Sequence, residues 1–327
     1  MKRTNLITAG LLILMMGIGG WTAWWFFLAT YGQRAITAAS QGDAKTKLEY
    51  MSIKRFGFPF KVGFRIREAR ITTPWLDRQA WVSTTYALLS ARPWRPRHIR
   101  INLPQGLRYA TSSGADWITG KAAAAEGLAT SNPIPHVELS LTNITARPPT
   151  SEPIKAKHGL VTWLKPTSGP QGLNFAFTRL HMAENALFGP TAKQADIKLR
   201  LYGEIPLDGN PENVAAWRAA DGKIDVTEAR VQWGGLDLLA TGMLGLDDGF
   251  RLTGGLNLKI KNSHATVDRL QALSLLTSEA STVAKTFLAL ASPGGGDRTN
   301  VPLVFANGEA SLYGFPIAYL KPVCACR

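Results

Sequence analysis

The sequence has few residues of the kinds that build disulfide frameworks or metal sites. Its 327 residues include two cysteines, Cys324 and Cys326, and five scattered histidines. Two cysteines this close together cannot build a framework, and no histidines stand in a His-x-x-x-His or His-Glu-x-x-His pattern. We therefore predict no metal and no cofactor, and interpret residues 324–327 as a tail with incidental thiols.

The motifs of common enzymes are missing as well. There is no Gly-x-Ser-x-Gly elbow. The glycine run at 294–296 leads into Asp297 rather than into the Lys-Ser or Lys-Thr pair of a phosphate loop, so it is interpreted as a linker. The adjacent carboxylates Asp247 and Asp248 precede a glycine, which is typical of a turn. We predict no catalytic residues; hydrolysis of an envelope polymer remains a third hypothesis.

Acidic residues are the scarcer charge, with 23 Asp and Glu against 37 Lys and Arg and a net charge of +14. Such an excess favours anionic partners such as lipid headgroups or nucleic acid. The basic residues stand singly along strand-like segments, as Lys61, Arg65, Arg67 and Arg70 do, and no nucleic-acid recognition motif accompanies them. The pattern predicts no nucleic-acid partner and a general attraction to anionic membrane surfaces.

One stretch, from Leu6 to Ala29, carries no charge at all over 24 residues. As a helix it is about 36 Å long, enough to cross a hydrocarbon core of about 30 Å. Basic residues precede it, and aromatic rings suited to the headgroup level gather at its far end. We predict an uncleaved transmembrane anchor at residues 6–29, with membrane contacts that include Leu6, Leu12, Trp21, Trp24 and Trp25.

Two other interpretations of this stretch remain. A cleaved signal peptide has a similar layout, but with a shorter apolar core of about 7–15 residues, and a buried core helix rarely needs so long an uncharged run. Positive residues favour the cytoplasmic side, which predicts a cytoplasmic N-terminus at residues 1–5, in the inner membrane of a Gram-negative cell. Residues 30–48 are predicted to continue the helix, and residues 49–323 to form a β-rich periplasmic body.

Alternation of apolar and polar residues dominates this body and predicts strands with one buried face. The clearest case is the segment 250–261, and similar segments lie at 62–67, 99–103, 137–142 and 196–201. Glycine-rich turns at 234–235 and 247–249 predict an antiparallel meander, and a shift of phase near Thr227 predicts a β-bulge. Helices are expected only near 211–220, 263–276 and 277–291.

These patterns predict a mainly β (β-rich α+β) protein. Its sheet is expected to be long, curved and antiparallel, or an incompletely closed sandwich or barrel, with a few short helices. One alternative is that the sheets cover each other completely; the other is that an apolar face lines a groove for an acyl chain or an unfolded peptide. For the groove, the candidate ligand-binding residues are Phe250, Leu252, Leu256, Leu258 and Ile260.

The order of these segments resembles the bacterial family known as domain of unknown function 2125, seen chiefly in alpha-proteobacteria. The most specific parts are Gly57-Phe58-Pro59 and the block from Glu228-Ala229-Arg230 through Gly242. The family has no established activity, so the resemblance implies no catalytic or ligand residue. The chain is also similar in layout to AsmA-like envelope proteins, some of which are implicated in lipid transport. This implies lipid or another amphiphile as a ligand, with an envelope protein partner as the alternative.

Overall fold

The fold was analysed in a computed structural model. It describes residues 2–41, 47–75, 78–113, 116–131, 134–148, 152–183, 186, 188–203, 211–261, 263–272, 278, 281–282, 285–286, 288 and 298–323. Most of the helix predicted at 277–291, and Cys324 and Cys326, lie outside these residues.

The chain begins with a single long helix, α1 (Lys2–Gln41), which contains the whole uncharged stretch. The segment after Ala29 has no proline that would stop the helix, so it runs on for three further turns. The predicted helical end at Lys47 and Leu48 is wrong: both residues lie in β1 (Lys47–Glu49), where Leu48 pairs with Ile71 at the sheet edge. Backbone pairing with the sheet therefore overrides the local helical tendency there.

The described residues of the body form one antiparallel sheet of 17 strands, as predicted. After β1 the strands are β2 (Ser52–Phe56), β3 (Val62–Trp75), β4 (Arg78–Arg92), β5 (Arg95–Leu103), β6 (Leu107–Ser113), β7 (Asp116–Thr130), β8 (His136–Arg147), β9 (Ile154–Leu164), β10 (Gln171–His181), β11 (Thr191–Tyr202), β12 (Lys223–Trp233), β13 (Leu236–Leu246), β14 (Leu252–Lys261), β15 (Arg298–Ala306), β16 (Glu309–Leu312) and β17 (Phe315–Tyr319).

The strands follow one another as a meander, with two exceptions. At its start, β3 pairs with both β1 and β2. Farther on, β5 and β6 lie end to end between β4 and β7 and together fill one strand position. The predicted bulge near Thr227 is confirmed, because the pairing of β12 with β13 skips from Val226 to Ala229.

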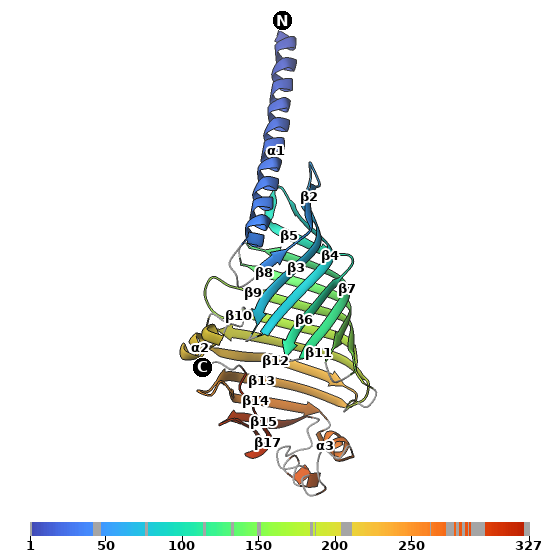
Figure 1. Cartoon of the computed structure of the whole chain (residues 1–327), viewed down its shortest axis with the longest axis vertical. Helices are drawn as coiled ribbons and strands as arrows, with labels where there is room; N and C mark the ends of the chain where they lie inside the picture. Colours follow the sequence, from blue (N-terminus) through green and yellow to red (C-terminus); the bar gives the residue numbers. More distant parts are fainter. Residues whose placement is uncertain are drawn as a thin grey trace.

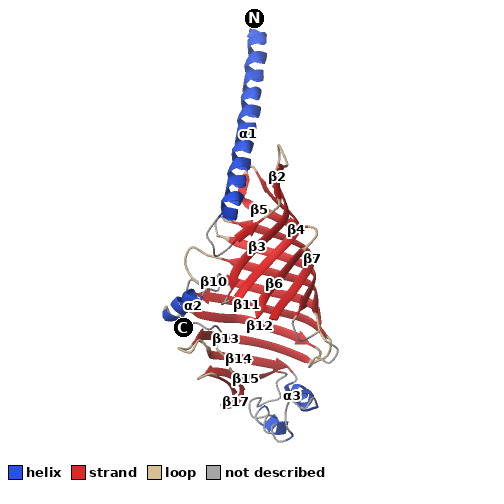
Figure 2. Cartoon of the chain, viewed as in Figure 1, coloured by secondary structure: helices blue, strands red, loops and turns tan. Residues whose placement is uncertain are grey.

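Two short helices whose bounds lie within the described residues accompany the lower half of the sheet. The first, α2 (Pro211–Ala219), begins at a proline whose missing N–H costs nothing at that position. The second, α3 (Ser263–Ala272), follows β14; residues 273–276 of the predicted helix 263–276 lie outside the described residues. Figure 2 shows both helices beside the sheet rather than stacked over its centre.

The sheet curls, so that its first and middle strands face each other. In Figure 1 the strands β3, β4 and β7 cross in front of β8, β9 and β10. Apolar side chains fill the space between these two layers, and the largest buried cluster joins Phe64 and Ile66 of β3 to Ile144 of β8 and Ala156 of β9. The core therefore lies inside the curl, at the end of the body nearest α1.

A line of irregular backbone crosses the curled part of the sheet. Along this line one residue pair is not formed in several strand ladders. In the ladder of β7 with β8, for example, the pair Ala122–Ile144 is followed directly by Ala124–Thr142. At the skipped position, β3, β8 and β10 each carry a residue with positive φ: Glu68 at 52°, Asn143 at 50° and Arg179 at 53°. We call this line, defined by Glu68, Asn143 and Arg179, the crease. Each of these strands gains one outward residue at the crease, and its apolar residues stay on the inner side.

Candidate apolar binding face

One face of the sheet is apolar along its whole width. Residues paired across an antiparallel ladder lie on the same face, so the register shows which side chains are neighbours. One row crosses twelve strands from β3 to β15, a path of roughly 50 Å at about 4.8 Å between strands. It consists of Phe64, Leu89, Ile101, Gly127, Leu139, Val161, Phe175, Ile197, Ala229, Ala240, Leu258 and Val301.

The rows on either side of this one are also apolar, whereas the opposite face is polar. A second row includes Leu141, Phe177, Val231, Leu238 and Ile260. On the opposite face, Lys198 forms an ion pair with Glu228 at 2.7 Å. The alternation therefore separates one continuous apolar surface, which we call the inner face, from a charged outer face.

The end of the inner face nearest α1 is closed by that helix. Trp25 and Ala29 are buried in the same cluster as Val62 and Phe64 of β3. Gly32 lies so close to the Phe64 ring that a Cβ at this position would be 2.8 Å from it. The part of α1 from Trp25 to Ile36 therefore covers the first strands of the sheet and leaves the lower inner face to other elements.

The far end of the inner face is covered by the helical region that follows β14. Val267 of α3 and Leu288 form a buried cluster with Val301 of β15, and Leu258 and Ile260 pack against it. Two of the five predicted groove residues are therefore part of a small closed core.

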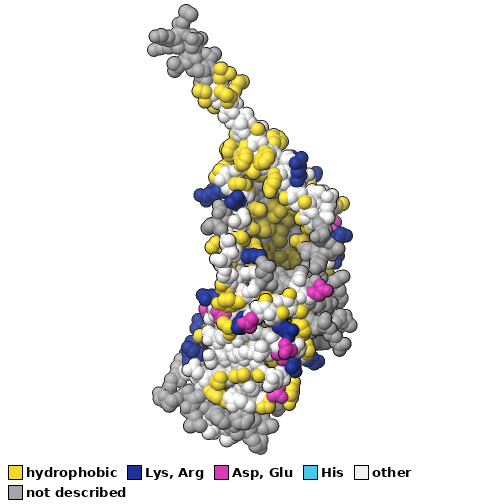
Figure 3. Space-filling view, turned by 90° about the vertical axis from the view of Figure 1, so that its left-hand side faces the viewer, with side chains coloured by type: hydrophobic (Ala, Val, Ile, Leu, Met, Phe, Trp, Pro, Cys, Tyr) yellow, Lys and Arg dark blue, Asp and Glu magenta, His cyan; other side chains and the backbone are white. Residues whose placement is uncertain are grey.

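Between these two covers, the middle of the inner face stays partly open. Val161, Phe175 and Leu199 are half-buried, and Ile197 is 38% exposed although its strand has a neighbour on each side. None of these four residues belongs to, or packs against, the buried clusters that the described parts of the helices join. Figure 3 shows a hollow lined by hydrophobic side chains in the body below α1. We call Val161, Phe175, Ile197 and Leu199 the open section.

The predicted groove residues do not act as one unit. Four of the five share a face, because they lie an even number of residues apart in a strand that pairs without interruption with β13: Leu252, Leu256, Leu258 and Ile260. Phe250 does not belong to it: it lies in the turn before β14 with φ of 57°, packs with Val214 and Leu246, and has the Arg218 guanidinium 4.9 Å from its ring centre. Its inclusion in the strand was wrong, since the turn changes the direction of the chain after Asp247.

The predicted membrane contacts lie in α1, but not all of them face outward. Leu12 and Trp24 are exposed, whereas Trp25 is only 4% exposed and Trp21 is half-buried. The backbone of Leu6 is helical and its side chain lies outside the description. Trp21 and Trp25 therefore help to hold the body against the helix.

The open section was visible in the sequence only in part. Ile197 and Leu199 stood in a predicted strand, whereas Val161 and Phe175 lie in β9 and β10, which were not predicted. The alternation in QGLNFAFTRL, where Leu173, Phe175 and Phe177 are two apart, was the available signal.

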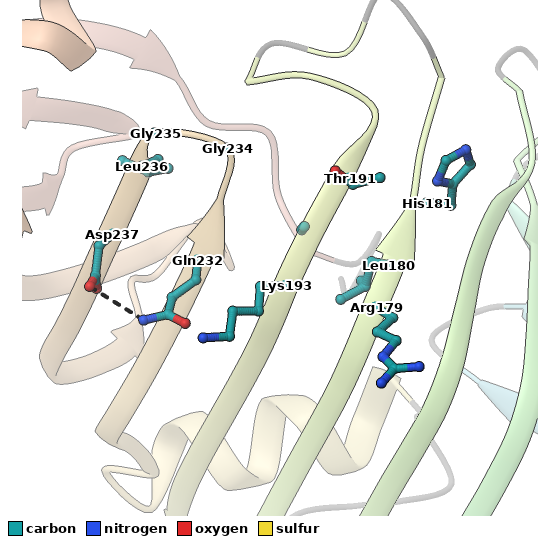
Figure 4. Close-up of a pocket in the computed structure, with 11 residues that line it drawn as sticks. Arg179, Leu180, His181, Thr191, Lys193, Gln232, Gly234, Gly235, Leu236 and Asp237 are labelled. Carbon is teal, nitrogen blue, oxygen red and sulfur yellow. Dashed lines mark hydrogen bonds between the residues drawn. The ribbon is translucent and has the colours of Figure 1, made fainter.

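A separate cleft of about 580 Å³ lies where the ends of β10, β11, β12 and β13 meet. In Figure 4, Lys193 extends toward Gln232, while Arg179 points away from both. Asp237 is the one carboxylate among its described lining residues; it accepts a hydrogen bond from Gln232 at 3.4 Å and lies 3.7 Å from Arg298. This carboxylate therefore has one hydrogen-bond partner and one cationic neighbour among the described residues.

Tyr109 and Asp247 show how the surroundings of an ionisable group shift its pKa. Burial raises the pKa of the Tyr109 phenol, which packs against the inner-face cluster. For Asp247, in the β13–β14 turn, desolvation would raise the pKa. Hydrogen bonds from the Arg251 and Gly249 amides and the charge of Arg251 outweigh it, so the pKa of this carboxyl is lowered. Among the described residues, no three His, Cys, Asp or Glu side chains gather as a metal site would require.

Fold and site together define the class of the protein. It is a β-rich protein with a curled antiparallel sheet that has one continuous apolar face. Its N-terminal helix is long and apolar enough to span a membrane, a property that signal sequences share. The model of a family described as "Uncharacterized protein conserved in bacteria (DUF2125)" matches residues 25–321. The chain therefore belongs to this family, as its motifs indicated. No curated protein and no solved structure matches the chain.

Proposed function

We propose that this protein is a non-catalytic lipid-binding protein of the bacterial envelope. In this proposal α1 crosses the inner membrane, the β-rich body lies in the periplasm, and the open section holds the acyl chain of a lipid or another amphiphile. The observation that supports this proposal is that Val161, Phe175, Ile197 and Leu199 stay partly open in the middle of the apolar inner face, whose two ends are covered.

The energetics favour an apolar ligand at this place. Exposed apolar area costs about 25 cal/mol per Å² relative to its burial, and ligand sites are typically concave and mostly apolar. An acyl chain lying along the row would shield these side chains from water without needing hydrogen bonds from them. The polar outer face, with ion pairs such as Lys198–Glu228, stays in water.

Site-specific photo-crosslinking of the full chain in membranes tests this proposal. The photoreactive residue p-benzoylphenylalanine replaces Ile197 in one variant and the neighbouring Lys198, on the outer face, in the other. A lipid adduct, identified by mass spectrometry, is expected at position 197 and not at 198. Lipids that surround α1 do not account for such a difference between adjacent positions.

A pair of substitutions on β10 makes the test specific to the inner face. Phe175→Glu places a charge in the row beside Ile197, and the matched Asn174→Glu places the same charge on the exposed outer side. Burying an unpaired carboxylate costs several kcal/mol, so the adduct yield at 197 should fall by at least about tenfold with the first variant alone. Equal yields would overturn the proposal, and a protein adduct at 197 would favour the alternative, a scaffold that binds another envelope protein.

A further inference from the structure

Two hairpin turns beside α1 carry large aromatic side chains that project into solvent. The turn between β2 and β3 exposes 53% of Phe58 and 68% of Phe60, and the turn between β4 and β5 exposes 53% of Trp94. We call these three residues the aromatic foot. Water-exposed aromatic rings of this size are unfavourable unless another phase receives them.

Both turns accept hydrogen bonds directly from side chains of α1. The indole N–H groups of Trp21 and Trp25 donate to the backbone carbonyls of Pro59 and Lys61 at 3.1 and 2.7 Å. The indole of Trp24 donates to the Pro93 carbonyl at 3.1 Å. Ring contacts add to these bonds, with Trp25 edge-on to Phe58 at 5.3 Å and Trp21 tilted against Trp94 at 6.2 Å. The two turns therefore share the depth of residues 21–25 along the helix axis.

That depth lies inside the uncharged stretch of the helix. About 20 helical residues cross a hydrocarbon core of about 30 Å, so a span that starts at Leu6 reaches its far boundary near Trp25. The aromatic foot, bonded at this level, then lies at the boundary between acyl chains and headgroups, where tryptophan and other amphipathic rings are favoured.

Basic side chains stand next to the foot. Lys61 and Arg92 are exposed, and the Arg92 guanidinium lies 5.8 Å from the centre of the Trp94 ring. A cation just beyond an interfacial ring is at the level of the lipid phosphates. Each such charge near an anionic surface is attracted to it.

We propose that Phe58, Phe60 and Trp94 insert into the headgroup boundary of the bilayer that α1 crosses, with Lys61 and Arg92 placed against anionic lipid phosphates. The body then stands on the membrane through two hairpins as well as the helix, and the inner face begins at the bilayer surface with Val62 and Phe64. This inference rests on the part of the proposed function that puts α1 in a membrane, and not on ligand binding.

Depth-dependent fluorescence quenching tests the inference on the full chain. With Cys324 and Cys326 changed to Ser, single cysteines are introduced as Phe60→Cys, Ile18→Cys in α1, and Lys259→Cys on the exposed side of β14. Each is labelled with an environment-sensitive dye in nanodiscs of phosphatidylcholine and phosphatidylglycerol that contain spin-labelled lipids. Labels at positions 60 and 18 should be quenched, and the label at position 259 should not.

The outcomes separate the two proposals. A quenched label at position 18 with an unquenched label at position 60 overturns the foot and leaves the anchor intact. Unquenched labels at both positions would contradict the assignment of α1 as a membrane-spanning helix. If Phe60→Cys disturbs its turn, Trp94→Cys makes the same measurement on the second hairpin, and lack of quenching there overturns the inference equally.

Discussion

Trp25 donates its indole N–H to the backbone carbonyl of Lys61 at 2.7 Å, and in doing so it joins α1 to the start of β3. The ring is almost fully buried between the helix and the apolar cluster of the sheet. A residue that lies in an uncharged membrane-type stretch thus serves as a contact between helix and body. The helix is therefore a part of the folded domain as well as a candidate anchor.

Replacing Trp25 tests this contact. Trp25→Ala should lower the free energy of unfolding by about 3–5 kcal/mol, because it removes a large buried ring and leaves a cavity. Trp25→Phe keeps most of the burial, and the lost hydrogen bond should cost about 1 kcal/mol. Chemical unfolding of the purified protein in detergent measures both values. The exposed Tyr31 offers a control: Tyr31→Phe should change little, and a loss as large as that of Trp25→Ala would contradict the assignment.

The crease explains how so long a sheet can curl and still keep one apolar face. On β8 the inward residues Leu141 and Ile144 are three apart, and both belong to or pack against the main buried cluster. The extra residue, Asn143, points outward in the left-handed region of φ and ψ. Asparagine tolerates this conformation better than other residues with a side chain, apart from aspartate.

Substitution at Asn143 should therefore depend on the backbone and not on contacts. Asn143→Val should destabilise the protein by about 1–2 kcal/mol, because a β-branched residue is strained at positive φ, and Asn143→Gly should be neutral or stabilising. Ala123, which lies between the same flanking pairs on β7, has no positive φ and is also exposed. Ala123→Val is the matched control. A similar loss from both valine variants, by thermal unfolding, would rule out backbone strain as the cause.

The sequence allowed the class of the fold to be predicted but not its curl. Segments such as Val62–Phe64–Ile66 alternate strictly, so their strands and apolar face could be recognised. At the crease the spacing changes from two to three residues, which removes the periodic signal on several strands at once. The register between strands far apart in the sequence, which aligns Phe64 with Val301 across the sheet, follows from pairing and not from local pattern.

The coverage of the predicted groove residues could not be inferred from the sequence for a related reason. Alternation identifies which residues share a face, as it did for Leu256, Leu258 and Ile260, but it does not tell which part of that face another element covers. The helical region after β14 covers Leu258 and Ile260, whereas Ile197 stays open. Coverage depends on the path of segments that lie elsewhere in the sequence.

Gly159 offers a test of the packing inside the curl. It lies on the inner face of β9, where an added Cβ would be 2.5 Å from the Ile144 side chain and 3.0 Å from the Phe177 ring. Gly159→Ala should destabilise the protein by about 1–3 kcal/mol through overpacking. On the next strand, a Cβ at Gly172 would meet its nearest atom at an ordinary 3.5 Å. Gly172→Ala should be nearly neutral in the same denaturant titration, and an equal loss from both variants would contradict a tightly packed inner face.

Asp247 should make the stability of the β13–β14 turn depend on pH. Its carboxylate accepts hydrogen bonds from the backbone amides of Gly249 and Arg251 at 2.8 and 2.9 Å and pairs with the Arg251 side chain at 3.0 Å. Its pKa is lowered in the folded state, so the unfolded chain binds more protons in acid. The stabilisation is then present above the unfolded pKa of about 3.9 and is lost as the pH falls through the folded value.

Asp247→Asn removes the ionisable group while keeping its shape, so it should lower the free energy of unfolding by roughly 1 kcal/mol at neutral pH. The difference from the unmodified protein should shrink as the pH falls below about 4, as followed by urea unfolding between pH 3 and 7. Asp248→Asn, at a fully exposed neighbour, should cost less at neutral pH. A difference that stays constant or grows in acid would contradict the assignment, since a carboxylate that matters through its charge must lose its effect once it is protonated.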